Sequence, residues 1–429
     1  MNASGRLVRR EPARSEVRPQ QPADHRRPAQ ADHHSVMWLS FLVLACTDAS
    51  SPAVAQTLWP TTGWTRSTFA EQQLDAARLT DLDARIRSGA FGYIDRMVVV
   101  RNGYLVMSER YTNDYAAISR GRTSPLGCGV DACASAAEVH EYNYLHPDWH
   151  PYPDGRAVHT LQSVTKSVTS ALIGIAIGRG EVSMDALLLS FFDDYDLARV
   201  DARLRRATLD DLLTMRTGIE WHESDRPLDD TNTTLQLERS QDWIQFTLNQ
   251  PMDAAPGTKW VYNSGGSHLM SGVIRKATGR FADDYAAEHL FGPLGIRAFH
   301  WKKTPKGYPD TEGGLYLEAE QLAKIGYLYL NGGMWDGRRI LPEGWTDAST
   351  ARRVERVNNA GWGYGYQWWR LDRGSTIVWA GLGFGGQFLF VLPQHRIIGV
   401  VNGWNLFGGG FPAVQGPFLD ALIASAGAG

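Results

Sequence analysis

Cysteine, lysine and long apolar runs are all scarce in this chain. It has 3 cysteines among 429 residues, so it is not one of the disulfide-dense scaffolds that staple a small core. No stretch is long and apolar enough for a membrane-spanning helix, and no internal repeat points to a solenoid or a propeller. The formal net charge of -3 gives no electrostatic reason to expect a nucleic acid or an anionic membrane as a partner. What remains is an ordinary globular composition, long enough to bury a large core.

The N-terminal segment differs from the rest of the chain. Residues 1–36 are rich in arginine, proline, glutamine and histidine, and such a segment cannot offset its ordering entropy by burial. From Met37, the apolar run at residues 38–45 resembles the core of a secretory signal. We therefore expect residues 1–56 to be a disordered leader with an export signal, and residues 57–429 to be the folded domain. The protein would then be periplasmic, membrane-anchored or secreted.

Two processing patterns follow the apolar run. Ala53-Val54-Ala55 has the small-x-small pattern of signal cleavage, whereas Cys46 closes a lipoprotein box and would carry a lipid anchor. Export would leave Cys128 and Cys133 as a pair flanking a short loop. An oxidising compartment favours a disulfide between them, with two free thiols as the alternative.

Residues 112–159 are irregular and rich in glycine, proline, histidine and tyrosine. Loops of this length are usually functional or disordered. His140, His146 and His150 lie here with Asp148, but free loop histidines are commoner than metal ligands and no Cys/His knuckle supports a zinc site. No metal and no cofactor are expected.

The pattern of apolar residues predicts a hairpin, then helices, then strands. Asn102-Gly103 lies between two apolar runs and predicts a β-hairpin, because it supplies the positive φ of a tight turn. Apolar residues at helical spacing predict a helix from Thr160 to Gly180. A second helix should begin at Leu209, capped by Thr208 and Asp211, and end at Gly218. Other helices are expected at residues 240–248, 268–277, 283–290, 318–330 and 414–426, and strands at residues 365–369, 376–379, 387–392 and 397–401.

The order of these elements does not alternate strand with helix. It predicts an α+β fold, in which an antiparallel sheet is flanked by helices and interrupted by an all-helical insertion at about residues 170–345.

The strongest chemical signal is Ser163-Val164-Thr165-Lys166. On a helix this spacing places the serine and the lysine on one face, one turn apart. Serine is a poor nucleophile until a base takes its proton, and lysine can be that base only when neutral. A dry cleft or a second nearby cation would lower the lysine pKa toward that state. A capping serine and a surface lysine are the alternative, but of the seven lysines only Lys166 has a serine three residues before it.

Two further patterns are weak alone. Tyr262-Asn263-Ser264 offers a phenol that can shuttle a proton, or else a turn before a helix. Gly381, Gly383 and Gly386 have dinucleotide-loop spacing, but no helix follows them. Glycines beside a strand can instead expose a backbone N–H to an oxyanion, or simply form a bend.

In this order, the three patterns resemble those of the β-lactamase-related serine hydrolases. This family includes class C β-lactamases, penicillin-recognising carboxypeptidases, serine esterases and 6-aminohexanoate-dimer hydrolases, and the resemblance runs from about Phe91 to the C-terminus. It is also carried by Leu290-Phe291-Gly292-Pro293-Leu294-Gly295 and by Gly313-Gly314-Leu315-Tyr316. Several spaced matches in order are more specific than any one of them.

The resemblance implies a role for each matched position. Ser163 would be acylated, Lys166 would take its proton, and Tyr262 would pass a proton to the leaving group. The backbone N–H groups of Ser163 and Phe384 would form the oxyanion hole. Ser264, Gly381 and Gly383 would line the substrate site.

Two departures from the family pattern change the expected substrate. Ser264 stands where β-lactamases typically have asparagine, and Gly381 stands where they have a lysine or histidine that binds a substrate carboxylate. We therefore expect hydrolysis of an ester or a short amide through an acyl-enzyme. β-Lactamase or D-Ala-D-Ala carboxypeptidase activity, and a non-catalytic binding protein on the same fold, are the alternatives. The oligomeric state cannot be predicted from these patterns.

Overall fold

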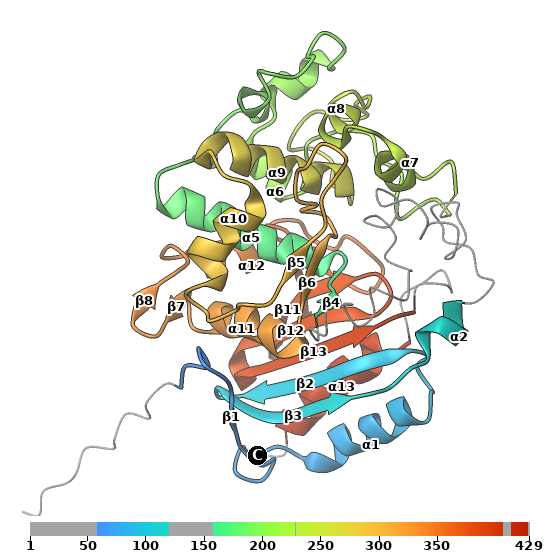
Figure 1. Cartoon of the computed structure of the whole chain (residues 1–429), viewed down its shortest axis with the longest axis vertical. Coiled ribbons are helices and arrows are strands. Elements are labelled where there is room, and N and C mark those ends of the chain that lie inside the picture. The colour runs from blue at the N-terminus through green and yellow to red at the C-terminus, as the bar shows by residue number, and fades with distance from the viewer. Residues whose placement is uncertain (1–57, 120–157, 228, 406–412, 428–429) are drawn as a thin grey trace, which may run out of the picture. The chain divides into compact units, whose positions relative to one another are not determined.

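The computed structural model describes residues 58–119, 158–227, 229–405 and 413–427. A sheet of eight strands lies at the centre of this part of the chain. The strand order is β1-β3-β2-β13-β12-β11-β10-β9, so strands from both ends of the domain lie side by side (Figure 1). Every pairing in this sheet is antiparallel except the short one between β1 and β3. The strands are β1 Thr65–Arg66, β2 Ile94–Arg101, β3 Tyr104–Arg110, β9 Gly363–Tyr364, β10 Trp369–Arg373, β11 Thr376–Gly383, β12 Gln387–Leu392 and β13 Ile397–Gly403.

The predicted hairpin is confirmed by β2 and β3. Asn102 and Gly103 have φ values of 52° and 86°, the left-handed conformation that the tight turn requires. The side chains of β2 alternate between the two faces of the sheet. Val98 and Val100 belong to one core, whereas Met97 and Val99 belong to another.

Helices cover both faces of the sheet. On one face α1 (Ala76–Arg87) packs against α13 (Gln415–Ala426), and their apolar residues share a core with β11 and β12. On the other face α11 (Ala319–Leu330) packs on β12 and β13, and α5 (Val164–Gly178) packs on β11. Since both faces are covered, β12 is buried along its whole length.

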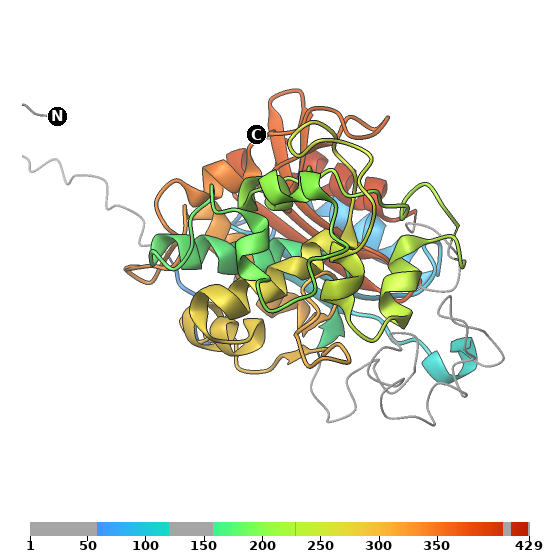
Figure 2. The same ribbon diagram turned by 90° about the horizontal axis from the view of Figure 1, so that it is seen from above.

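The predicted helical insertion lies between β3 and β9 in the chain, and its helices lie over the sheet (Figure 2). Besides α5 and α11, the described α-helices of this region are α6 Leu209–Leu213, α7 Thr233–Arg239, α8 Trp243–Leu248, α9 Ser264–Thr278, α10 Ala282–Ala286 and α12 Trp345–Thr350. A short helix, α2 (Tyr115–Ser119), follows β3. Two small sheets complete the region: β4 (His159–Thr160), β6 (Leu315–Leu317) and β5 (His300–Trp301) form one, and β7 (Met334–Trp335) and β8 (Arg338–Arg339) form the other. The prediction of an all-helical insertion is wrong in this respect, because β5, β6, β7 and β8 lie within residues 170–345.

Four predicted helix boundaries need correction, two of them because α8 begins at Trp243 rather than at residue 240 and α9 at Ser264 rather than at residue 268. The capping box of Thr208 and Asp211 is present, but α6 ends at Leu213 because Met215 already has a φ of 56°. The helix predicted from Thr160 begins only at Val164, because residues 159–160 pair with β6 as a strand.

The strand predicted at residues 365–369 is wrong except for Trp369. Gln367 has a φ of 59°, and its side-chain amide donates to the carbonyl of Leu213 (3.0 Å) while its amide oxygen accepts from Ser267 (2.8 Å). These bonds to the helical region hold the chain away from the sheet between β9 and β10.

Among the described helices, none combines the length and the apolar character that crossing a bilayer would need.

Candidate active site

Ser163 lies at the point where β4 gives way to α5. Gln162 has a left-handed φ of 47°, and its side-chain amide donates to Thr160 Oγ1 (3.1 Å), which fixes the sharp turn. Ser163 takes the N-cap position of α5, and its side chain makes no cap hydrogen bond. Since α5 is buried on all sides from Val164 to Ala176, the half-buried Ser163 sits on a rigid central element.

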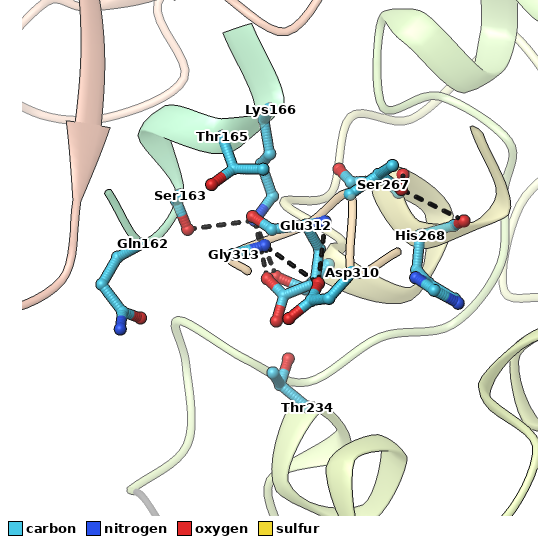
Figure 3. Close-up of polar contacts among 12 residues, drawn as sticks. Gln162, Ser163, Thr165, Lys166, Thr234, Ser267, His268, Asp310, Glu312 and Gly313 are labelled. Atoms are coloured by element: carbon cyan, nitrogen blue, oxygen red, sulfur yellow. Dashed lines mark hydrogen bonds and ion pairs between the residues drawn. The ribbon is translucent and has the colours of Figure 1, made fainter. Parts of the chain in front are cut away.

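Lys166 lies one helical turn further and points back at Ser163, as predicted from the spacing. Its Nζ is 3.0 Å from Ser163 Oγ (Figure 3), and the residue is 1% exposed. Three more oxygens surround Nζ: Ser264 Oγ at 3.1 Å, the carbonyl of Glu312 at 2.8 Å and Glu312 Oε2 at 3.0 Å. The amine of Lys166 therefore has four oxygen atoms within hydrogen-bond distance.

The expectation that the site lowers the pKa of Lys166 is wrong. Burial by itself lowers this pKa, but the charge that Tyr262 carries when it is ionised and the carboxylates of Glu312 and Glu223 outweigh it and raise the pKa above its ordinary value. Lys166 therefore rests as an ammonium ion at neutral pH.

Tyr262 approaches the same pair from the loop before α9. Lys166 Nζ lies 5.2 Å from the centroid of its ring, within cation–π range. Burial raises the pKa of Tyr262, while the charge of Lys166 and a hydrogen bond with Ser163 lower it, so that the net direction is upward. The ring is stacked on Trp369, with 5.7 Å between centroids, and lies 6.5 Å from Tyr364. This aromatic packing fixes the phenol beside Ser163 and Lys166.

Ser264 is tied to a carboxylate that sequence reasoning missed. Its hydroxyl donates to Glu223 Oε1 (2.8 Å), and its backbone N–H donates to Glu223 Oε2 (3.0 Å). Asn263 is the N-cap of α9, and its side chain accepts from the N–H of Gly266 (2.6 Å). Asn263 thus starts the helix, which leaves Ser264 to contact Lys166.

Glu312 was also missed, and it comes from a third segment. Its backbone N–H and that of Gly313 both donate to Asp310 Oδ1, at 3.0 and 3.1 Å. Asp310 Oδ2 in turn pairs with Lys302 Nζ at 3.1 Å, and both side chains are buried. The one available signal was an acidic residue directly before Gly313-Gly314 and the buried strand β6.

Gly381 and Gly383 are placed where β11 crosses the start of α5. A Cβ on Gly381 would lie 2.9 Å from Val164 Cγ1, and one on Gly383 would lie 2.6 Å from the carbonyl oxygen of Leu161. The glycines therefore let the strand approach the turn that carries Ser163. Phe384, whose N–H was predicted to serve the oxyanion hole, follows Gly383 directly in the turn to β12.

Several predicted features lie outside the described residues. These are the leader with Cys46, the pair Cys128 and Cys133, and the histidines His140, His146 and His150. Within the described ranges, no cluster of three or more histidine, cysteine, aspartate or glutamate side chains could hold a metal ion.

Several known proteins are similar to this chain in sequence. A family model described as Beta-lactamase matches residues 129–425 of the chain. The 6-aminohexanoate-dimer hydrolase of Paenarthrobacter ureafaciens is 23% identical over 274 residues, which is 59% of this chain and 67% of that protein.

Solved structures share the fold. EstCE1, a hydrolase with promiscuous acyltransferase activity, aligns with a TM-score of 0.60 at 15% identity, over 83% of this chain and 100% of that one. A D-stereospecific amidohydrolase from Streptomyces sp. aligns with a TM-score of 0.56 at 15% identity, over 81% of this chain and 97% of that one. The predicted α+β fold class is confirmed.

Proposed function

Because the chain belongs to the β-lactamase family of hydrolases, as its motifs predicted, we propose that it forms an acyl-enzyme on Ser163 from an ester or a short amide. The observation that carries the proposal is the contact of 3.0 Å between Ser163 Oγ and Lys166 Nζ, with the phenol of Tyr262 beside both. A hydroxyl and an amine in hydrogen-bond contact, with a phenol beside them, are the groups that nucleophilic catalysis by serine needs.

The proposed reaction has two halves. Ser163 Oγ gives its proton toward Lys166 and attacks the carbonyl carbon, and the carbonyl oxygen becomes an oxyanion facing the N–H groups of Ser163 and Phe384. Tyr262 delivers a proton to the leaving oxygen or nitrogen as its bond to carbon breaks. Water then adds to the acyl-enzyme with the same groups in reverse roles, releasing the acid and restoring Ser163.

The charges around the site favour substrates without a carboxylate. Gly381 brings no cation, and the residues around Lys166 include Glu223 and Glu312. One ammonium and two carboxylates give a local charge of about -1, which repels an anionic substrate.

Labelling with a fluorophosphonate tests the nucleophile. We expect the wild-type protein to be labelled and Ser163→Ala to be silent, because the probe forms a covalent bond to an activated serine oxygen. Ser170→Ala is the matched control, since it removes a buried hydroxyl from the same helix about two turns away. Labelling that persists in Ser163→Ala would place the nucleophile elsewhere and end the proposal.

A comparison of ester charge tests the substrate class. We expect kcat/KM for neutral p-nitrophenyl butyrate to exceed that for the anionic hemisuccinate ester by about tenfold or more, and nitrocefin to be turned over more slowly than either. Added salt should narrow the gap between the two esters, since ions screen the repulsion. A preference for the anionic ester, or rapid hydrolysis of nitrocefin, would contradict the proposed substrate class and favour β-lactamase activity instead.

A further inference from the structure

Lys166 faces more oxygens than it has hydrogens. As an ammonium ion, Lys166 carries three hydrogens on Nζ. Three of its neighbours accept from it, namely the Glu312 carbonyl, Glu312 Oε2 and Ser264 Oγ. Ser264 Oγ can only accept here, because it donates its own hydrogen to Glu223. The fourth neighbour, Ser163 Oγ, competes with these three acceptors for the same hydrogens, since Nζ also donates to it at 3.0 Å. Because the nitrogen of an ammonium ion has no lone pair, Nζ can take the serine proton only after giving one of its own away.

The three acceptors differ in what they can do with that proton. A backbone carbonyl and a serine hydroxyl are far too weakly basic to hold it, whereas a carboxylate can. The carboxylate of Glu312 lies 3.0 Å from Nζ, and its side chain is 6% exposed, so bulk water does not compete for the same position.

The surroundings of Glu312 favour its protonated form more than water does. Burial raises the pKa of this carboxyl, the charge of Lys166 lowers it, and the carboxylates of Asp310 and Glu223 raise it further, against the opposing charge of Lys302. Glu238 on α7 faces the same group of charges, and burial raises its pKa to about 8. Glu312 is therefore fixed beside the amine with a basicity closer to neutral pH than an exposed glutamate has.

We propose that Glu312 is the proton acceptor that makes Lys166 a base, so that the nucleophile is activated by a Ser163–Lys166–Glu312 relay. This inference rests on the proposed function. One proton passes from Nζ to Glu312 Oε2 and the amine turns its freed lone pair to Ser163. The serine proton then moves to Nζ as Oγ bonds to the carbonyl carbon and the carbonyl electron pair moves to oxygen. The proton held on Glu312 returns through Lys166 and Tyr262 to the leaving group.

The relay removes the difficulty that a charged lysine poses for catalysis. Over the whole transfer, Ser163 loses one proton and Glu312 gains one. Lys166 is an ammonium ion both before and after the transfer. Glu312 touches neither the nucleophile nor the substrate and acts through Lys166, so its contribution should be visible in the pH profile.

Glu312→Gln is the direct test, because the amide keeps the size of the side chain and its hydrogen bond to Lys166 but cannot hold a proton. We expect the rate of fluorophosphonate labelling, and kcat/KM for p-nitrophenyl butyrate, to fall about 10²–10³-fold. In the wild-type protein both should rise with pH as Glu312 ionises, in a limb above the ordinary value of 4.5. Glu312→Gln should lose this limb and gain activity only at alkaline pH, where Lys166 itself loses a proton.

Two variants make the outcome decisive. Glu223→Gln removes the carboxylate that binds Ser264, and it should keep an acid limb set by Glu312 but move it to lower pH, because the charge of Glu223 no longer raises the pKa of Glu312. Glu312→Asp keeps a protonatable group at a greater distance, and it should keep a limb at a shifted position with a reduced rate.

An acid limb that Glu312→Gln leaves in place, with a rate within about threefold of wild type, would overturn the relay. If Glu312→Gln fails to fold, an unshifted limb and an unchanged rate in Glu312→Asp would do the same. Wild-type protein whose Ser163 takes no label would instead overturn the proposed function, so the two failures are distinguishable.

Discussion

Replacing Lys166 with alanine is expected to lower kcat for p-nitrophenyl butyrate by on the order of 10³–10⁴-fold, because Ser163 then has no partner for its proton. Tyr262→Phe should cost on the order of 10²-fold or more, since the leaving group loses its proton donor. The double variant should be little worse than Lys166→Ala alone, because both side chains act on the same proton transfers. Steady-state kinetics of the four proteins checks this.

Loss of folding must be separated from loss of chemistry. Lys166→Ala leaves the carboxylate of Glu312 buried without its cation, which costs roughly 3–5 kcal/mol of stability. Adding Glu312→Gln to Lys166→Ala should recover part of the lost Tm without recovering kcat. Lys324→Met is the matched control, since it removes another buried lysine, whose Nζ binds the carbonyl of Leu294 rather than Ser163. Effects of Lys166→Ala and Tyr262→Phe that multiply in full would show that the two residues act independently, contrary to the proposal.

The pairing of Ser163 with Lys166 was predictable because it is local. Helical spacing alone places the two side chains on one face, and the apolar residues of α5 announced the helix. The charge state of Lys166 was not predictable, because the groups that raise its pKa are distant in sequence, and Glu312, which contacts it directly, is 146 positions away. A sequence pattern shows which groups can react, but their protonation depends on segments that only the fold brings together.

The fold shows the same division between local and distant causes. The hairpin at Asn102-Gly103 and strand β12 were predicted because turn chemistry and a run of apolar residues suffice for them. The stretch before Trp369 was misread because its alternating aromatics look like a strand, whereas Gln367 is held by Leu213 and Ser267 of the helical region. Long-range polar bonds of this kind leave no local pattern.

The second large effect is expected from adding a side chain at Gly383, where β11 passes the turn that carries Ser163. Gly383→Ala would place a Cβ 2.6 Å from the carbonyl oxygen of Leu161 and 2.9 Å from Gln387 Cβ, and both are closer than real Cβ contacts. Because the first of these atoms belongs to the backbone just before Ser163, the strand or the turn must shift. A shift would move the N–H of Phe384 relative to that of Ser163, and misplacing one oxyanion donor costs about 10²–10³-fold in kcat. Overpacking should also cost about 1–3 kcal/mol of stability.

Gly416→Ala supplies the matched comparison for this substitution. Gly416 lies in the first turn of α13, and a Cβ there would meet no atom within 4 Å. We expect it to leave kcat unchanged and to raise the stability by at most about 1 kcal/mol, because alanine is the better helix former. Thermal melts and ester kinetics of both variants separate the two consequences of Gly383→Ala, since a shifted oxyanion hole lowers kcat even when the protein is fully folded. Wild-type kcat in folded Gly383→Ala would mean that the close approach of β11 to α5 serves packing alone and that the oxyanion donors lie elsewhere.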